Sequence, residues 1–244
     1  MRPVPPAVSA IAARLAERTW VTDLWVAGSL ASGDYVPGVS DLDLVALVDG
    51  TPPSSDLVDL HRELDVRHAD SDLGCAYLPI DRLSDPDTAH PTWTHGRLVH
   101  RPVSALTRAE LVRDGFAVLG RPPSQVLPPV TDDDVRAAAR AEVLGYWAMA
   151  SRRPWWWLDR VIADLGLTSM ARGRYAARHG RLLTKSEAIQ QADAPGWLIE
   201  QLRARRRGHD VVSPRLRTGW IAWRDARRTV RALTVAEVRR RPGA

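Results

Sequence analysis

Residues 28–43 read GSLASGDYVPGVSDLD, and this stretch decides how the first half of the chain is expected to fold. An apolar run over 24–27 ends directly before Gly28-Ser29, and a β-rich run over 42–48 begins inside Ser40-Asp41-Leu42-Asp43. Short apolar runs bounded by Gly, Ser and Asp are typical of strands joined by turns. The pattern therefore predicts a strand, a turn with a short helix, and a second strand.

Two carboxylates in this stretch have the spacing of a strand. Asp41 and Asp43 are two residues apart, and side chains of a strand alternate between its faces, so both carboxylates are expected on one side with Cα atoms about 6.5 Å apart. Mg²⁺ is typically held by one or two carboxylates together with phosphate oxygens. The pair therefore predicts a Mg²⁺ site that acts on phosphate groups.

The Gly28-Ser29 turn predicts a phosphate site beside the carboxylates. Glycine lets the backbone come close to a triphosphate, and N–H groups at the start of the short helix attract anions. Ser29 and Ser40 add hydroxyl donors. Either half of the motif alone favours a surface turn with solvated aspartates, whereas the two halves together favour nucleotidyl transfer.

Residues 28–43 resemble the signature of the DNA polymerase β-type nucleotidyltransferase superfamily, in its small stand-alone form. Within that group the chain most resembles the aminoglycoside adenylyltransferases of the streptomycin/spectinomycin type. The resemblance implies an α/β plus α fold, in which an N-terminal mixed sheet with helices is followed by an all-helical domain. We expect a nucleotidyltransferase domain over 1–128 and a helical domain over 129–244 that closes over the nucleotide.

The second half resembles the family more loosely, over residues 171–180 and 181–188. In the family, a helix with an Arg leads to a Gly and then to a Lys, and both cations reach the nucleotide phosphates. Arg172 and Lys185 stand at the matching positions. By this resemblance they bind the nucleotide together with Gly28, Ser29 and Ser40.

The implied reaction transfers AMP from ATP to a hydroxyl of a small molecule with Mg²⁺ as cofactor, and the acceptor is an aminoglycoside-type antibiotic or another hydroxylated compound. Two alternatives stay open. The acceptor could be a protein or an RNA, or the chain could be a non-catalytic nucleotide-binding module. The sequence does not identify the acceptor hydroxyl or the oligomeric state.

A third carboxylate of the family is missing from its expected place. Polymerase β-type enzymes commonly carry it on the next strand, where it binds the metal or acts as general base. Here that strand is expected over 73–80, and Gly74 or a direct neighbour occupies the matching position. Asp72 could reach the same face if the strand begins early, although it also fits a solvated turn; Asp65 and Asp70 are more distant candidates.

Composition limits the remaining classes. The chain has 244 residues, a formal net charge of +5 and a single cysteine, Cys75, which excludes an intramolecular disulfide and a thiolate metal cluster. The basic excess lies in Arg-rich segments over 203–207 and 227–241, which fit solvated helix faces better than a nucleic-acid site. No segment has the length of a membrane span or the apolar region of a signal peptide, so we expect a cytoplasmic protein.

The rest of the chain is expected to be mostly helical. Helices are expected over 8–20, from Leu57 to Leu64, from an apparent capping box at Thr107-Arg108-Ala109-Glu110, and over 131–149, 156–179, 185–192, 196–207 and 214–240. Residues 92–104 predict either an irregular segment or a short β-ribbon. The Pro-rich segment 120–129 is the expected domain boundary. Trp155-Trp156-Trp157 and Asp159 could line an acceptor cleft or pack between domains, and His90 and His95 could line that cleft or lie on the surface.

Overall fold

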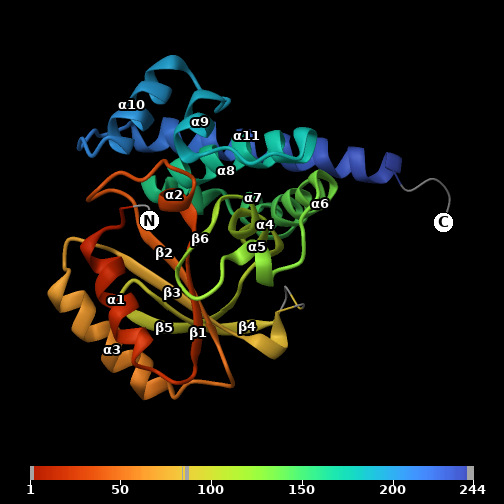
Figure 1. Cartoon of the computed structure of the whole chain (residues 1–244). Helices are drawn as coiled ribbons and strands as arrows, with labels where there is room; N and C mark the ends of the chain where they lie inside the picture. The colour runs from red at the N-terminus through yellow and green to blue at the C-terminus, as the bar shows by residue number, and fades with distance from the viewer. Residues whose placement is uncertain (1–2, 84, 86–87, 241–244) are drawn as a thin grey trace. The chain divides into compact units, whose positions relative to one another are not determined.

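A computed structural model of the chain describes residues 3–83, 85 and 88–240, shown in Figure 1. The chain divides into two compact units, Met1–Val130 and Thr131–Ala244. The division directly follows the Pro-rich segment. The first unit contains α1 (Pro6–Ala16), β1 (Val21–Val26), α2 (Gly28–Ala31), β2 (Leu42–Val48), α3 (Ser54–Arg67), β3 (Leu73–Pro79), η1 (Ile80–Arg82), β4 (Ala89–Thr94), β5 (Arg97–Pro102), α4 (Ala105–Asp114), β6 (Phe116–Leu119) and α5 (Pro123–Val126).

The first unit is built on a mixed sheet of six strands in the order β5-β4-β3-β2-β1-β6. β2 and β3 are parallel, whereas β1 pairs antiparallel with β2 and β6. The expected mixed sheet is thus confirmed. The β-ribbon interpretation of 92–104 is also confirmed, since β4 and β5 pair as an antiparallel hairpin. The edge strand β6 was not predicted from the sequence.

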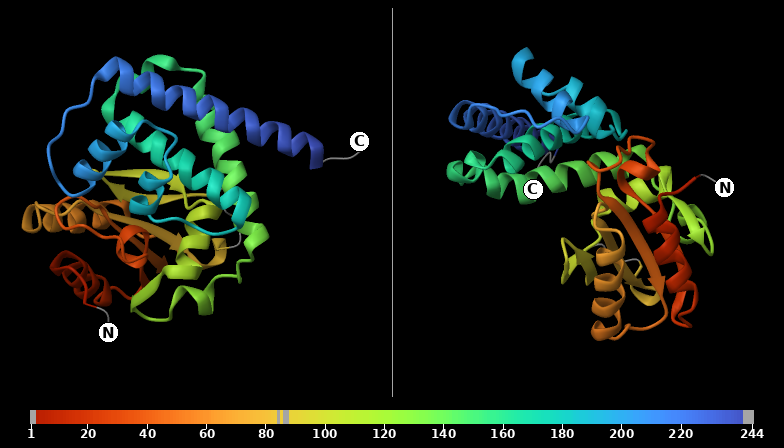
Figure 2. Two further views of the ribbon diagram at one scale, coloured as in Figure 1. Left: turned by 90° about the horizontal axis from the view of Figure 1, so that it is seen from above. Right: turned by 90° about the vertical axis from the view of Figure 1, so that its left-hand side faces the viewer.

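Both faces of the sheet are covered, because alternate side chains of the central strands point in opposite directions. Leu44 and Cys75 pack with buried residues of α1 and α3, and these two helices lie side by side on that face (Figures 1 and 2). Val45 and Ala76 pack with Leu111 of α4 on the other face. Odd-numbered positions of β2 and even-numbered positions of β3 therefore face α4.

One predicted helix start is wrong. The apparent capping box at Thr107 is not a helix terminus, because α4 already begins at Ala105, two residues before Thr107. Ser104 is the N-cap, and its hydroxyl accepts the backbone N–H of Thr107 at 3.2 Å. Glu110 consequently lies in the body of the helix rather than at its first turn.

The second unit is helical. It contains α6 (Asp132–Glu142), the π-helical turn η2 (Val143–Trp147), α7 (Ala148–Ser151), the 3₁₀ turn η3 (Pro154–Leu158), α8 (Arg160–His179), α9 (Lys185–Gln190), α10 (Gly196–Arg206) and α11 (Arg215–Arg240). The helix expected over 131–149 is observed as a continuous helical run over 132–151 that contains one π-helical turn. The helix expected over 156–179 begins only at Arg160, since the Asp159 carboxylate caps it by accepting the N–H groups of the next residues.

Buried aromatic side chains hold the helical unit together. Trp147 and Trp157 are 3% and 1% exposed and pack with apolar residues of α8, α10 and α11. Among the helices described over residues 3–240, none is long and apolar enough to cross a membrane.

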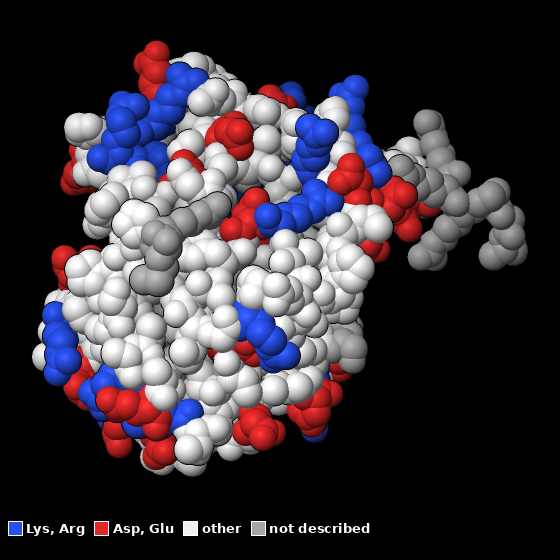
Figure 3. All heavy atoms as spheres, in the orientation of Figure 1, with Lys and Arg blue, Asp and Glu red and all other residues white. Residues whose placement is uncertain are grey.

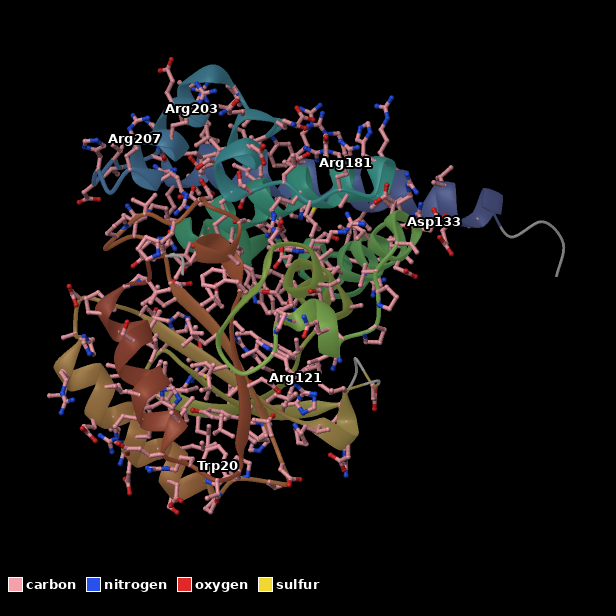
Figure 4. All side chains as sticks on the ribbon, viewed as in Figure 1. Trp20, Arg121, Asp133, Arg181, Arg203 and Arg207 are labelled. Atoms are coloured by element: carbon pink, nitrogen blue, oxygen red, sulfur yellow. The ribbon has the colours of Figure 1, made fainter. Side chains whose placement is uncertain are left out.

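The Arg-rich run of α10 divides between surface and interior. Figure 3 shows basic side chains gathered over this part of the helical unit, and Arg203 and Arg207 are labelled there in Figure 4. Both are exposed. Arg205, between them, donates to the Asp164 carboxylate at 2.7 and 2.9 Å. The run thus contributes an ion pair to the helical unit as well as surface charge.

Candidate active site

The carboxylate of Asp43 lies directly against the Gly28 turn. The N–H of Ala27 donates to the Asp43 carbonyl oxygen at 2.8 Å, which joins the end of β1 to the start of β2. A Cβ atom at Gly28 would lie only 2.2 Å from Oδ2 of Asp43. Gly28 also has a φ of +59°, a conformation that favours glycine. Backbone conformation and the closeness of the carboxylate therefore both require glycine at position 28.

Gly28 and Asp43 line a hollow of about 260 Å³ on the α4 side of the sheet. Its wall includes backbone and side chains from β2, β3, the end of β5 and α4. The lining residues are Ala27, Gly28, Asp43, Leu44, Val45, Gly74, Cys75, Ala76, Arg101, Pro102, Val103, Ser104, Thr107 and Glu110. Burial raises the pKa of the Cys75 thiol to about 12, so this thiol stays protonated and is unsuited to act as a nucleophile or metal ligand.

Asp41 lies outside the strand and is exposed. It lines a second hollow, of about 490 Å³, together with Ser40, Asp65, Asp70 and Asp72. Asp41 and Asp43 thus border different hollows at the beginning of β2. In the described part of the chain no group of three or more His, Cys, Asp or Glu side chains could hold a metal ion. Two carboxylates are nevertheless a sufficient protein donor set for Mg²⁺ when phosphate oxygens complete its shell.

Ser29 and Ser40 are buried, at 8% and 6% exposure, and both make hydrogen bonds that shape the turn. The carbonyl oxygen of Ser29 accepts the N–H of Asp34 at 2.9 Å. The Ser40 hydroxyl oxygen accepts the N–H of Val36 at 3.0 Å. These bonds fix the loop between α2 and β2, and direct contact of the two hydroxyls with phosphate stays a prediction.

The position expected to carry the third carboxylate has no side chain. Gly74 pairs with Asp43 in the parallel β2–β3 register. A Cβ atom there would lie 4.0 Å from Oδ1 of Asp43 and 3.6 Å from the carbonyl oxygen of Trp93, both ordinary contacts. The site therefore has room for a side chain beside Asp43 that this sequence does not supply.

Asp72 does not line the Asp43 hollow. Its Oδ2 lies 2.9 Å from Nδ1 of His95, and its side chain is 43% exposed. Asp72 instead lines the hollow that contains Asp41. Its role as the third carboxylate accordingly stays a prediction.

A polar face of α4 was missed in the sequence. Ser104, Thr107 and Glu110 recur at every third residue and all line the Asp43 hollow. Residues three apart on a helix lie on the same side, so this spacing was a readable signal. It was obscured because Thr107 to Glu110 also fits the capping-box pattern.

Arg172 and Lys185 lie in the helical unit and are close in its fold. The Nε–H of Arg172, on α8, donates to the carbonyl oxygen of Leu183 at 2.8 Å. Lys185 follows two residues later as the first residue of α9. Both side chains are partly exposed. The loop that carries Lys185 is thus attached to Arg172, while contact of either cation with a nucleotide stays a prediction.

The aromatic run and the two histidines have mixed environments. Trp157 is buried in the core of the helical unit, whereas Trp155 is 63% exposed. Trp157 therefore serves packing. His90 is 1% exposed within β4, contrary to a surface position, and His95 is exposed with its ring against Asp72.

Residues 8–82 match the family model of the nucleotidyltransferase domain. No curated protein matches the sequence. The structure is similar to that of the spectinomycin adenyltransferase AAD(9) from Enterococcus faecialis, crystallised with ATP and spectinomycin. The TM-score is 0.68 at 13% sequence identity, over 91% of this chain and 98% of that chain. The expected fold class is confirmed, and the Gly28–Asp43 motif lies within the residues that match the nucleotidyltransferase domain model.

Proposed function

Because residues 8–82 match the family model of the nucleotidyltransferase domain, we propose that this protein transfers AMP from ATP to a hydroxyl group of a small molecule in a Mg²⁺-dependent reaction. The proposed acceptor is an aminoglycoside-type antibiotic. Asp41 and Asp43 would hold Mg²⁺, and the Gly28-Ser29 turn with Ser40 would contact the β- and γ-phosphates. Arg172 and Lys185 would neutralise phosphate charge when the helical unit closes over the nucleotide.

The observation that carries the proposal is the close fit between Gly28 and Asp43. The Asp43 carboxylate lies where a Cβ atom at position 28 would collide with it. The turn and the carboxylate are therefore close enough to contact the same ligand. This arrangement suits a metal-bound triphosphate, whose oxygens would lie beside the glycine backbone. Mg²⁺, when bound, would supply positive charge to the phosphate oxygens.

The acceptor is the finer part of the proposal. The similar fold of AAD(9), which was crystallised with ATP and spectinomycin, supports a small hydroxylated acceptor. Trp155 is the exposed member of the Trp155-Trp156-Trp157 run, and its ring would suit a sugar ring with cationic groups. The proposal therefore makes a polycationic aminocyclitol or aminoglycoside the first compound class to test.

Pyrophosphate release with ATP and Mg²⁺ across a panel of aminoglycosides tests the function. The Asp43→Asn and Asp41→Asn variants should lose at least about 10³-fold in turnover, because a metal ion supplies several kcal/mol of charge stabilisation. Asp49→Asn is the matched control, since Asp49 is an exposed aspartate just after the other end of β2. It should retain full activity.

Three results would contradict parts of this proposal. Release that no antibiotic stimulates would remove the antibiotic as acceptor. Labelled AMP on a protein or RNA would identify a macromolecular acceptor instead. A wild-type protein that binds ATP but releases no pyrophosphate with any acceptor would be a nucleotide-binding module.

A further inference from the structure

We propose that Glu110, on α4, is the general base that accepts the proton of the acceptor hydroxyl. This inference rests on the proposed nucleotidyl transfer. It assigns to a helix the carboxylate that the neighbouring strand lacks at Gly74.

The first argument is position. Glu110, Asp43 and Gly74 line the same hollow of about 260 Å³. Asp43 and Gly74 reach it because odd positions of β2 and even positions of β3 face α4. Glu110 reaches it from the opposite wall, on a helix that covers this face. A carboxylate and the candidate metal ligand Asp43 thus border one space.

The second argument is room. A Cβ atom at Gly74 would make only ordinary contacts, the nearest at 3.6 Å. With glycine at this position, the space beside Asp43 is left to a reacting hydroxyl and to a side chain from the facing helix. Within the hollow the other ionisable side chains are Asp43, Cys75 and Arg101. Of these, Asp43 is the proposed metal ligand, Cys75 stays protonated and Arg101 is a cation, so Glu110 is the lining group suited to accept a proton.

The third argument is rigidity, since a general base must hold its position. Arg108, two residues before Glu110, donates to the carbonyl oxygens of Val103 and Asp85, each at 2.9 Å. Ala109 and Leu111, on either side of Glu110, are 1% and 0% exposed. These contacts fix α4 in place. Glu110 itself is only partly buried and lines the hollow.

The proposed step is balanced with ATP and the acceptor alone. The acceptor oxygen forms a bond to the α-phosphorus of ATP while its proton moves to a carboxylate oxygen of Glu110. The bond between the α-phosphorus and the bridging oxygen of the leaving group breaks, and pyrophosphate departs with those electrons. Glu110 later returns the proton to solvent.

The test compares Glu110→Gln with wild type in turnover and in ATP binding. General-base catalysis contributes about 10²–10⁴-fold, so we expect kcat to fall by that factor while the ATP dissociation constant changes less than twofold. Asp114→Asn is the matched control, because Asp114 is an exposed carboxylate at the end of the same helix. It should leave both quantities unchanged.

The inference is overturned if Glu110→Gln retains kcat within threefold of wild type. It is equally overturned if ATP binding weakens as much as turnover, since Glu110 would then bind nucleotide rather than accept a proton. Thermal unfolding of each variant reports whether it is folded. Failure of the proposed function looks different, because wild type itself would then show no turnover with any acceptor, and the role of Glu110 would fall with it.

Discussion

Comparing Gly28→Ala with Gly33→Ala should separate the effect of backbone strain from the effect of moving Asp43. The new Cβ atom at position 28 would lie 2.2 Å from Oδ2 and 3.0 Å from Cγ of Asp43. An ordinary contact is at least 3.4 Å, so the carboxylate must move by about 1 Å, a displacement that can cost about 10²-fold in rate. Gly28→Ala should therefore lose about 10²-fold or more in turnover.

Gly33→Ala is the matched control for this substitution. Gly33 also has a positive φ, +77°, but nothing lies within 4 Å of a Cβ atom there. Both variants carry a left-handed alanine, at about 1–2 kcal/mol. Gly28→Ala adds the collision, which in overpacked sites costs about 1–3 kcal/mol. We expect losses in unfolding free energy of about 2–5 kcal/mol for Gly28→Ala and about 1–2 kcal/mol for Gly33→Ala.

Urea denaturation measures the free energies, and Mg²⁺-dependent pyrophosphate release measures turnover, at a temperature where both variants are folded. The reasoning is refuted if the two variants have the same turnover. It is also refuted if Gly28→Ala is no less stable than Gly33→Ala, because the collision with Asp43 would then cost nothing.

Three further predictions concern single sites. Gly74→Glu in the Glu110→Gln background should restore at least tenfold in turnover, because a side chain at Gly74 has room beside Asp43, the proposed metal ligand. Arg121→Ala should lower the free energy of unfolding at pH 7, since the Arg121 guanidinium donates to the buried Asp23 carboxylate at 2.8 and 3.2 Å. Burial lowers the pKa of His61 to about 3, so wild type should lose about 1.4 kcal/mol of stability per pH unit, relative to His61→Phe, as the pH falls from about 6.5 toward 3.

Each of these has its own check. Gly74→Gln in the same background lacks the carboxylate, and equal recovery with Gln and Glu would contradict the first prediction. Burial alone would raise the pKa of Asp23, but the hydrogen bonds and charge of Arg121 lower it overall. The Arg121 contribution should therefore vanish as the pH falls below 3.8 and through the lowered pKa; an undiminished difference there would disprove it. Parallel stability curves for wild type and His61→Phe would exclude a buried neutral histidine.

Most strands and helices could be predicted from the sequence, because the patterns that indicate them span only a few neighbouring residues. The run from Leu42 to Val48 is apolar throughout and ends at Asp49-Gly50, and it forms β2. The short strand β6 was missed because its four residues are only partly buried and depend on pairing with β1. The start of α4 at Ala105 was missed because Thr107 to Glu110 fits the capping-box pattern, whereas the N-cap of the helix is Ser104.

The candidate site could be predicted only in part, because some of its contacts join residues that are distant in the sequence. Gly28 and Asp43 are close in sequence, and their strands are neighbours, so the motif itself predicts their contact. Asp72 is only two residues from Gly74 in the sequence, but its carboxylate lies beside His95 and outside the Asp43 hollow. The direction of a side chain at the end of a strand depends on the residues that surround it in the fold. For Asp72 these include His95, which is distant in the sequence.

The sequence by itself predicted that a glycine turn and the Asp43 carboxylate lie together, through a motif confined to residues 28–43. The conformational freedom of glycine acts over one or two residues, so the motif carries its consequence directly, whereas Asp41 lies outside β2 and borders a different hollow from Asp43. Only the tertiary structure brought Glu110 to the wall of the hollow that holds Asp43 and Gly74. That meeting joins residues far apart in the chain, because it depends on the parallel register of β2 and β3 and on the packing of α4 against the sheet.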